Sequence, residues 1–166
     1  MVVGQRRDSR IHRGRDNVIS FNRIGNTHQL LSDGGAIYVL GRQPRSVMEG
    51  NYVFSSPRSL YPDDGSSGWD IHHNFVNTTY KAWLHIASDR DYDIRVYDNY
   101  VKDNYLINDG VGVQVLRTEN FRNRPFSQTA LDIAERAGIE AAYRDIVPGQ
   151  EPPVMRIAPD FHIEKW

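Results

Sequence analysis

The chain has 166 residues with 20 basic and 21 acidic side chains, so its net charge is −1 and nothing favours a nucleic-acid partner. It contains no cysteine, which excludes disulfide bonds and zinc sites built on thiolates. No run of about 18 apolar residues occurs, so we expect no membrane partner. The length fits one domain with a sizeable core.

One pattern recurs four times between residues 18 and 101. An apolar residue stands three positions before an Asn, and another stands two positions after it, in VISFNRI, VMEGNYV, DIHHNFV and IRVYDNYV. The shared residues are Asn22, Asn51, Asn74 and Asn99. The alternating apolar residues and the Gly, Asn and Asp at the breaks indicate strands, and the interval fits one coil of a solenoid.

This repeat predicts an all-β fold, a right-handed parallel β-helix of about four coils. Successive coils stack at about 4.8 Å, which piles apolar side chains inside. An Asn at a corner tolerates left-handed backbone and can bond to the same Asn of the next coil. An antiparallel sandwich is the alternative fold, but it does not predict a recurring Asn.

The pattern changes after residue 120. A helix is expected over residues 127–137, with Ser127 as its N-cap and Gly138 at its end. Its apolar stripe consists of Ala130, Ile133, Ala134 and Ala137. We expect a domain of residues 1–146, in which this helix caps an open end, and a Pro-rich tail of residues 147–166. The N-terminal edge is expected to need further coils or a second copy as its partner.

Acidic residues follow the repeated Asn at similar distances. Asp33 comes 11 residues after Asn22, the Asp63–Asp64 pair comes 12 and 13 after Asn51, and His85 comes 11 after Asn74. The spacing predicts one column of acids and a His on neighbouring coils. Each Asp-Gly step also indicates a turn, so a purely structural role for these acids remains open.

The same residues suggest carbohydrate chemistry. Hydrolysis of a glycosidic bond uses two carboxyl groups, one as acid and one as base or nucleophile. Asp33 with Asp63 or Asp64 would supply them, and like charges at close range raise one pKa. Only one of Asp63 and Asp64 is expected to enter the groove. Predicted substrate-binding residues are Tyr38, Tyr61, Trp69, Trp83 and His85.

Other functions remain open. The chain would instead be a non-catalytic carbohydrate-binding or structural β-helix if its acids serve only backbone hydrogen bonds. A calcium-dependent polysaccharide lyase would need an acidic metal cluster and a basic residue, which nothing in the sequence singles out. His72 and His73 should point in opposite directions along a strand, so we expect no metal site there and no cofactor.

Five strings within residues 16–146 carry a resemblance: SDGGAIYVLG, GNYV, LYPDDGSSGW, IHHNFV and AERAGIEAAYRD. They resemble bacterial right-handed parallel β-helix repeat proteins, with glycoside hydrolase family 141, the xylanase and α-L-fucosidase group, as the nearest. The resemblance implies a secreted or periplasmic protein acting on a poly- or oligosaccharide, with Asp33, Asp63 and Asp64 in its groove. The chain resembles a C-terminal portion, because most N-terminal coils of that family are missing. The Gly-His-Gly and Arg-Ile-Lys elements of polygalacturonase-type helices are also absent.

Overall fold

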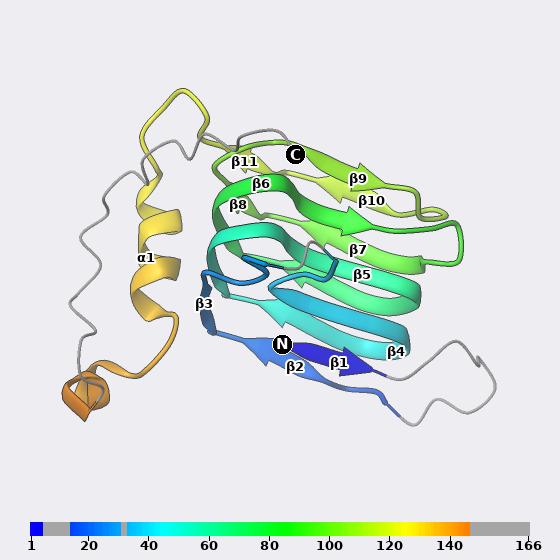
Figure 1. Ribbon diagram of the computed structural model, residues 1–166, viewed down its shortest axis with the longest axis horizontal. Helices are drawn as coiled ribbons and strands as arrows, with labels where there is room; N and C mark the ends of the chain where they lie inside the picture. The colour runs from blue at the N-terminus through cyan, green and yellow to red at the C-terminus, as the bar shows by residue number, and fades with distance from the viewer. Residues whose placement is uncertain (5–13, 31–32, 147–166) are drawn as a thin grey trace.

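A computed structural model describes residues 1–4, 14–30 and 33–146 (Figure 1). The predicted tail of residues 147–166 lies outside this range. The described strands are β1 (Val2–Gly4), β2 (Val18–Ser20), β3 (Arg23–Gly25), β4 (Ile37–Glu49), β5 (Tyr52–His72), β6 (Phe75–Ile86), β7 (Tyr92–Tyr97), β8 (Tyr100–Val101), β9 (Leu106–Asn108), β10 (Gln114–Leu116) and β11 (Glu119–Asn120).

Every pairing recorded between these strands is parallel. The chain therefore winds as a solenoid with three faces. Face A contains β1, residues 37–40, 60–63 and 84–86, and β9. Face B contains β2, residues 46–49 and 69–72, β7 and β10. Face C contains β3, residues 52–54 and 75–77, β8 and β11.

The repeated Asn forms a ladder between faces B and C. The Oδ1 atom of Asn74 accepts hydrogen bonds from the backbone N (3.1 Å) and Nδ2 (2.9 Å) of Asn51. Asn22 donates to Asn51 in the same way, and Asn74 donates to Asn99. The prediction of a parallel solenoid with aligned Asn is confirmed, and the sandwich is excluded. About three turns of solenoid are present, and the expected count of four coils is not confirmed.

A second column, immediately before the ladder, makes this corner possible. Its members all have φ between +49° and +63°, the left-handed region: Phe21, Gly50, His73, Asp98 and Arg117. A left-handed residue at each of these corners turns the chain sharply from face B to face C. Four of the five are not glycine, so tertiary structure holds them in a conformation that L side chains seldom adopt.

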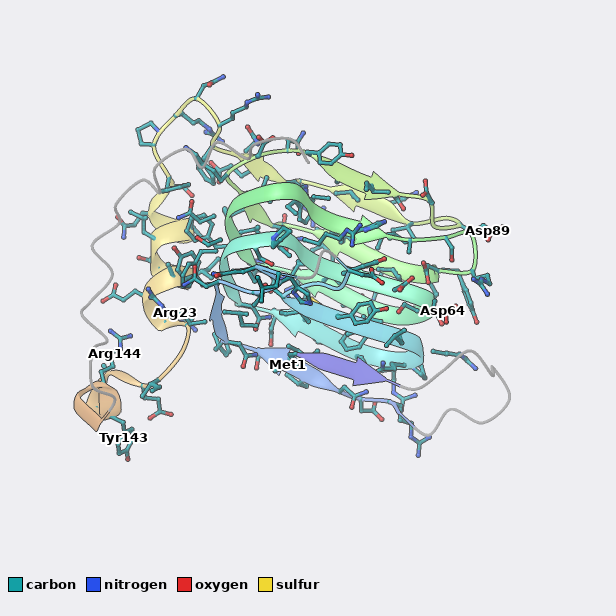
Figure 2. The ribbon with its side chains drawn as sticks, in the orientation of Figure 1. Met1, Arg23, Asp64, Asp89, Tyr143 and Arg144 are labelled. Carbon is teal, nitrogen blue, oxygen red and sulfur yellow. The ribbon has the colours of Figure 1, made fainter. Side chains whose placement is uncertain are left out.

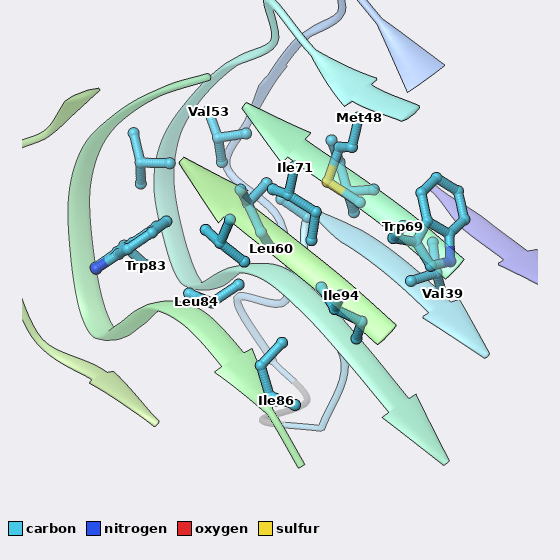
Figure 3. Packing of buried hydrophobic residues seen from close by; sticks show 14 of the residues in the cluster. Val39, Met48, Val53, Leu60, Trp69, Ile71, Trp83, Leu84, Ile86 and Ile94 are labelled. Atoms are coloured by element: carbon cyan, nitrogen blue, oxygen red, sulfur yellow. The ribbon is translucent and has the colours of Figure 1, made fainter. Parts of the chain in front are cut away.

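The core is filled by apolar side chains stacked coil on coil (Figure 3). Ile37, Leu60 and Leu84 share one inward column of face A, and all three are fully buried. Met48 and Ile71 stack in the same way on face B. Alternation of inward and outward side chains along each strand makes the intervening residues point to the surface.

The C-terminal helix α1 (Gln128–Arg136) forms where the sequence predicts it. Ser127 caps it, because its side chain accepts a hydrogen bond from the Ala130 amide at 3.4 Å. The predicted stripe is buried against Tyr52, Phe75 and Phe121 of face C. The helix thus lies along the side of the solenoid and not across an end (Figure 1), so the expected end cap is wrong.

A short 3₁₀ helix (Ala141–Ile146) follows α1. Neither helix of the described residues has the length and apolar character to cross a membrane.

Candidate functional site

An aromatic column runs up the outer side of face A. Tyr38, Tyr61 and His85 occupy equivalent positions on three successive coils, each beside an inward residue of the core. The Tyr38 and Tyr61 ring centroids are 5.0 Å apart, and those of Tyr61 and His85 are 4.3 Å apart and nearly parallel. Their sequence intervals, 23 and 24 residues, match the coil length and could have revealed this column.

The stacking leaves mainly ring edges toward solvent. Tyr61 has His85 against one side and Tyr38 against it on the next coil, and it is only 6% exposed. Gly35 packs so closely on it that a Cβ there would lie 2.7 Å from the Tyr61 Cβ. A sugar therefore cannot lie flat on the Tyr61 ring and would meet the polar edges of this column.

Asp63 and Asp64 separate as expected, one toward face A and one away from it. The Asp63 carboxylate accepts a 2.6 Å hydrogen bond from the Tyr38 hydroxyl and a 2.8 Å bond from the Asp64 amide. Asp64 adopts φ +46° at the turn, and its carboxylate lies 3.4 Å from Arg90. Asp64 lies at a bend on the side of the solenoid remote from α1 (Figure 2).

Buried Asp91 holds the turn that carries Asp63. Its Oδ1 atom accepts hydrogen bonds from the amides of Gly65 (2.9 Å) and Ser66 (2.8 Å), and its Oδ2 atom accepts from the Ser88 amide (2.9 Å). Burial raises the pKa of Asp91, while these three amides act in the opposite direction. Sequence reasoning missed Asp91, because an Asp in the segment DRDYD has no local signal of its burial.

Asp33 lies at the edge of the same face, and its side chain is 90% exposed. Its Oδ1 atom is 3.4 Å from the Arg58 guanidinium, which in turn lies 5.3 Å from the centre of the Tyr61 ring. Sequence reasoning also missed Arg58, although it stands three residues before Tyr61. Arg58 thus links the exposed acid to the aromatic column.

The expected straight column of acids is not formed. Asp63 lies opposite Leu40, and His85 lies opposite Tyr61 and Ile107. An irregular register between Ser56 and Arg58 of β5 and their partners in β6 brings His85 opposite Tyr61. Asp33 lies ahead of β4, because the first coil is longer than the next two. The acids nevertheless gather around one side chain, since Asp63, Asp109 and Asp33 all act electrostatically on His85.

The electrostatics of this face follow from burial and charge. Burial, and then the positive charge of Arg58, lower the pKa of His85, so its imidazole is neutral at pH 7. Burial, and then the hydrogen bond to Asp63, raise the pKa of Tyr38 well above its usual range. Burial likewise raises the pKa of Tyr61. A neutral imidazole both donates and accepts hydrogen bonds.

Two predicted substrate-binding residues lie elsewhere. Trp69 and Trp83 are 1% and 0% exposed and belong to the apolar core (Figure 3). Neither ring can stack on a sugar, so the prediction is wrong for both. Trp69 stands two residues before Ile71 and points inward with it. Trp83 is fully buried in the same apolar cluster, where its volume fills the solenoid.

His72 and His73 meet, contrary to expectation. The left-handed backbone of His73 turns its ring so that the two Nδ1 atoms lie 2.9 Å apart. Within the described residues, no group of three or more His, Cys, Asp or Glu side chains forms a candidate metal site.

No family model matches the sequence, and no curated protein matches it. One solved structure, described as "Glycoside hydrolase", is similar to the chain with a TM-score of 0.46 and 26% sequence identity. The similarity covers 82% of this chain and 20% of that one, so the chain spans about a fifth of that protein's length. The activity in the description is that protein's own.

Proposed function

We propose that the chain is carbohydrate-active and that face A binds a poly- or oligosaccharide. The supporting observation is the outward column of Tyr38, Tyr61 and His85, flanked by the Arg58–Asp33 ion pair and by Asp63. Sugar hydroxyls donate and accept at once, and the neutral His85 imidazole and the tyrosine edge do the same. Arg58 and Asp33 add donors and acceptors at the rim.

Cleavage of a glycosidic bond is the activity that we propose for this face. Asp63, which two hydrogen bonds fix in position, is the proposed base or nucleophile. Exposed Asp33 is the proposed partner carboxyl group, from which a leaving-group oxygen would take its proton. Asp64 is not part of this pair, because it lies at the turn, where its carboxylate points away from face A and toward Arg90. His85 would orient a substrate hydroxyl.

Saccharide binding without cleavage is the second candidate. One observation favours it: the Asp63 carboxylate already accepts hydrogen bonds from the Tyr38 hydroxyl and the Asp64 amide, as a purely structural acid would. A polysaccharide lyase is less well supported. It would need an acidic metal cluster on this face, and the described residues form no candidate metal site. The two leading candidates share the binding surface and differ only in whether product forms.

Hydrolysis and binding on one glycan panel separate these candidates. Asp63→Asn should abolish product formation and leave binding measurable, whereas Asp64→Asn, the matched neighbour, should leave both unchanged. His85→Ala should weaken binding. Binding that needs His85 without any product would favour the second candidate. Absence of both binding and product across the panel would refute the proposal for face A.

The resemblance to family 141 glycoside hydrolases extends the proposal in three ways. The winding is right-handed, which parallel β crossovers almost always are. The protein is secreted or periplasmic. The chain corresponds to the C-terminal portion of such an enzyme, so its own activity would be weak without further coils.

A further inference from the structure

The two ends of the solenoid present matching sets of strands. β1, β2 and β3 form the first rung, and β9, β10 and β11 form the last, one strand for each face (Figure 1). Within the described residues, each of these six strands pairs on one side only. An unpaired strand edge is a template for another strand, so each end can accept a further rung.

The side chains at the two ends are complementary in register. On face B, Val115 belongs to the inward column that begins with Ile19, so a further rung would stack these apolar residues. On face C, Glu119 belongs to the column that begins with Arg23. Glu119 already pairs with Arg124 at 2.9 Å and accepts a hydrogen bond from Ser127 at 3.3 Å. Stacking the first rung on the last would place Arg23 beside it as a second base, about 4.8 Å away.

Exposed apolar side chains mark both ends. Met1 and Val18 are 51% and 64% exposed on the first rung, and Val111 and Leu116 are 59% and 47% exposed at the last. The Asn ladder is also open at its start. Asn51, Asn74 and Asn99 are fully buried, whereas Asn22 is half-buried because no earlier coil covers it within the described residues.

We propose that a second copy of this chain supplies the further coils by stacking head-to-tail, with the β1–β3 rung of one copy on the β9–β11 rung of the other. All three parallel sheets then continue across the junction. Helix α1 does not obstruct it, because α1 lies along face C (Figure 1). The junction joins unlike surfaces and does not close, so association continues beyond the dimer.

Charge reversal at the junction tests this arrangement. Arg23 is visible near the α1 side of the first coils (Figure 2), and Glu119 lies on the last rung of face C. Sedimentation velocity across a concentration series should show the mean mass of the wild type rising past that of a dimer. Arg23→Glu or Glu119→Arg alone should lower the association constant about fivefold.

A mixture of the two variants gives the sharpest result. At one kind of junction, Glu119 of the Arg23→Glu variant meets Arg23 of the Glu119→Arg variant. At the other kind, the two introduced residues meet, and their charges are again opposite. Alternating copies therefore match at every junction, and association should return to the wild-type level. Glu135→Arg on the exposed side of α1 is the control and should change nothing. Circular dichroism would show that each variant is folded.

Three outcomes would overturn the proposal. The first is a monomer at every concentration, which is also the result expected if a coil from a different polypeptide occupies these edges. The second is a dimer that does not grow further. The third is association that neither reversal weakens.

Discussion

Asn74 is the side chain whose loss should reveal the most about the solenoid. It is fully buried, and its Oδ1 accepts bonds from the backbone N and Nδ2 of Asn51. Its own Nδ2 donates to Met48 O, His72 O and Asn99 Oδ1. Asn74→Ala removes all of these at once and leaves a buried backbone donor of Asn51 without its acceptor.

The expected cost follows from those bonds. A typical hydrogen bond contributes about 1 kcal/mol net, and an orphaned buried donor costs about 1–3 kcal/mol. Asn74→Ala should therefore lower the free energy of unfolding by about 3–5 kcal/mol, a large fraction of the ~5–15 kcal/mol of a single domain. Asn22→Ala is the matched control at the open end of the ladder, where about 1–2 kcal/mol is expected.

Urea unfolding followed by circular dichroism measures both variants. The reasoning predicts that the cost at Asn74 is clearly larger than the cost at Asn22, with the m-value unchanged. Equal costs, or a cost at Asn74 below about 1 kcal/mol, would show that the ladder is not a cooperative element of the fold.

Three further predictions concern the turns and face A. Gly68→Ala should cost about 3 kcal/mol or more, because φ is +78° and the new Cβ would lie 2.5 Å from the Pro44 Cα, whereas Gly65→Ala (φ +82°, nothing within 4 Å) should cost only about 1–2 kcal/mol in denaturant unfolding. Tyr38→Phe should cost about 1 kcal/mol in the same assay through loss of the bond to Asp63, and no change would mean that this bond contributes nothing. NMR titration should place the pKa of His85 below its ordinary value. Since the unfolded chain then binds the proton more tightly, the contribution of His85 to stability is present above pH 6.5 and is lost as the pH falls below 6.5 and through the lowered pKa of the folded state; an unshifted titration would contradict this.

The sequence predicted a structural feature correctly wherever that feature requires one particular type of residue at a fixed position. The recurring Asn predicted the ladder, because only a corner amide that bonds along the stack explains it at that interval. Ser127 and the alanine stripe predicted α1 and its buried side for the same reason. The position of α1 was not predictable, because the aromatic patch of Tyr52, Phe75 and Phe121 forms only when three coils stack.

The candidate site was predicted in part. Tyr38, Tyr61 and His85 do share one face, and Asp33 and Asp63 lie beside it. Trp69 and Trp83 were assigned to that face, although they fill the core. Residue type alone does not separate a ring that binds sugar from a ring that packs.

By itself, the sequence determined that the chain winds as parallel β coils, because periodic apolar residues and a repeated corner Asn have few other physical solutions. The tertiary structure alone decided which side chains meet. The regular pairing of residues 37–40 with residues 60–63 places Asp63 beside Tyr38, whereas the longer first coil leaves Asp33 ahead of β4, and the left-handed residue His73 turns toward His72. Position along the chain sets the coil, but a bulge or a left-handed residue decides locally which side chains meet.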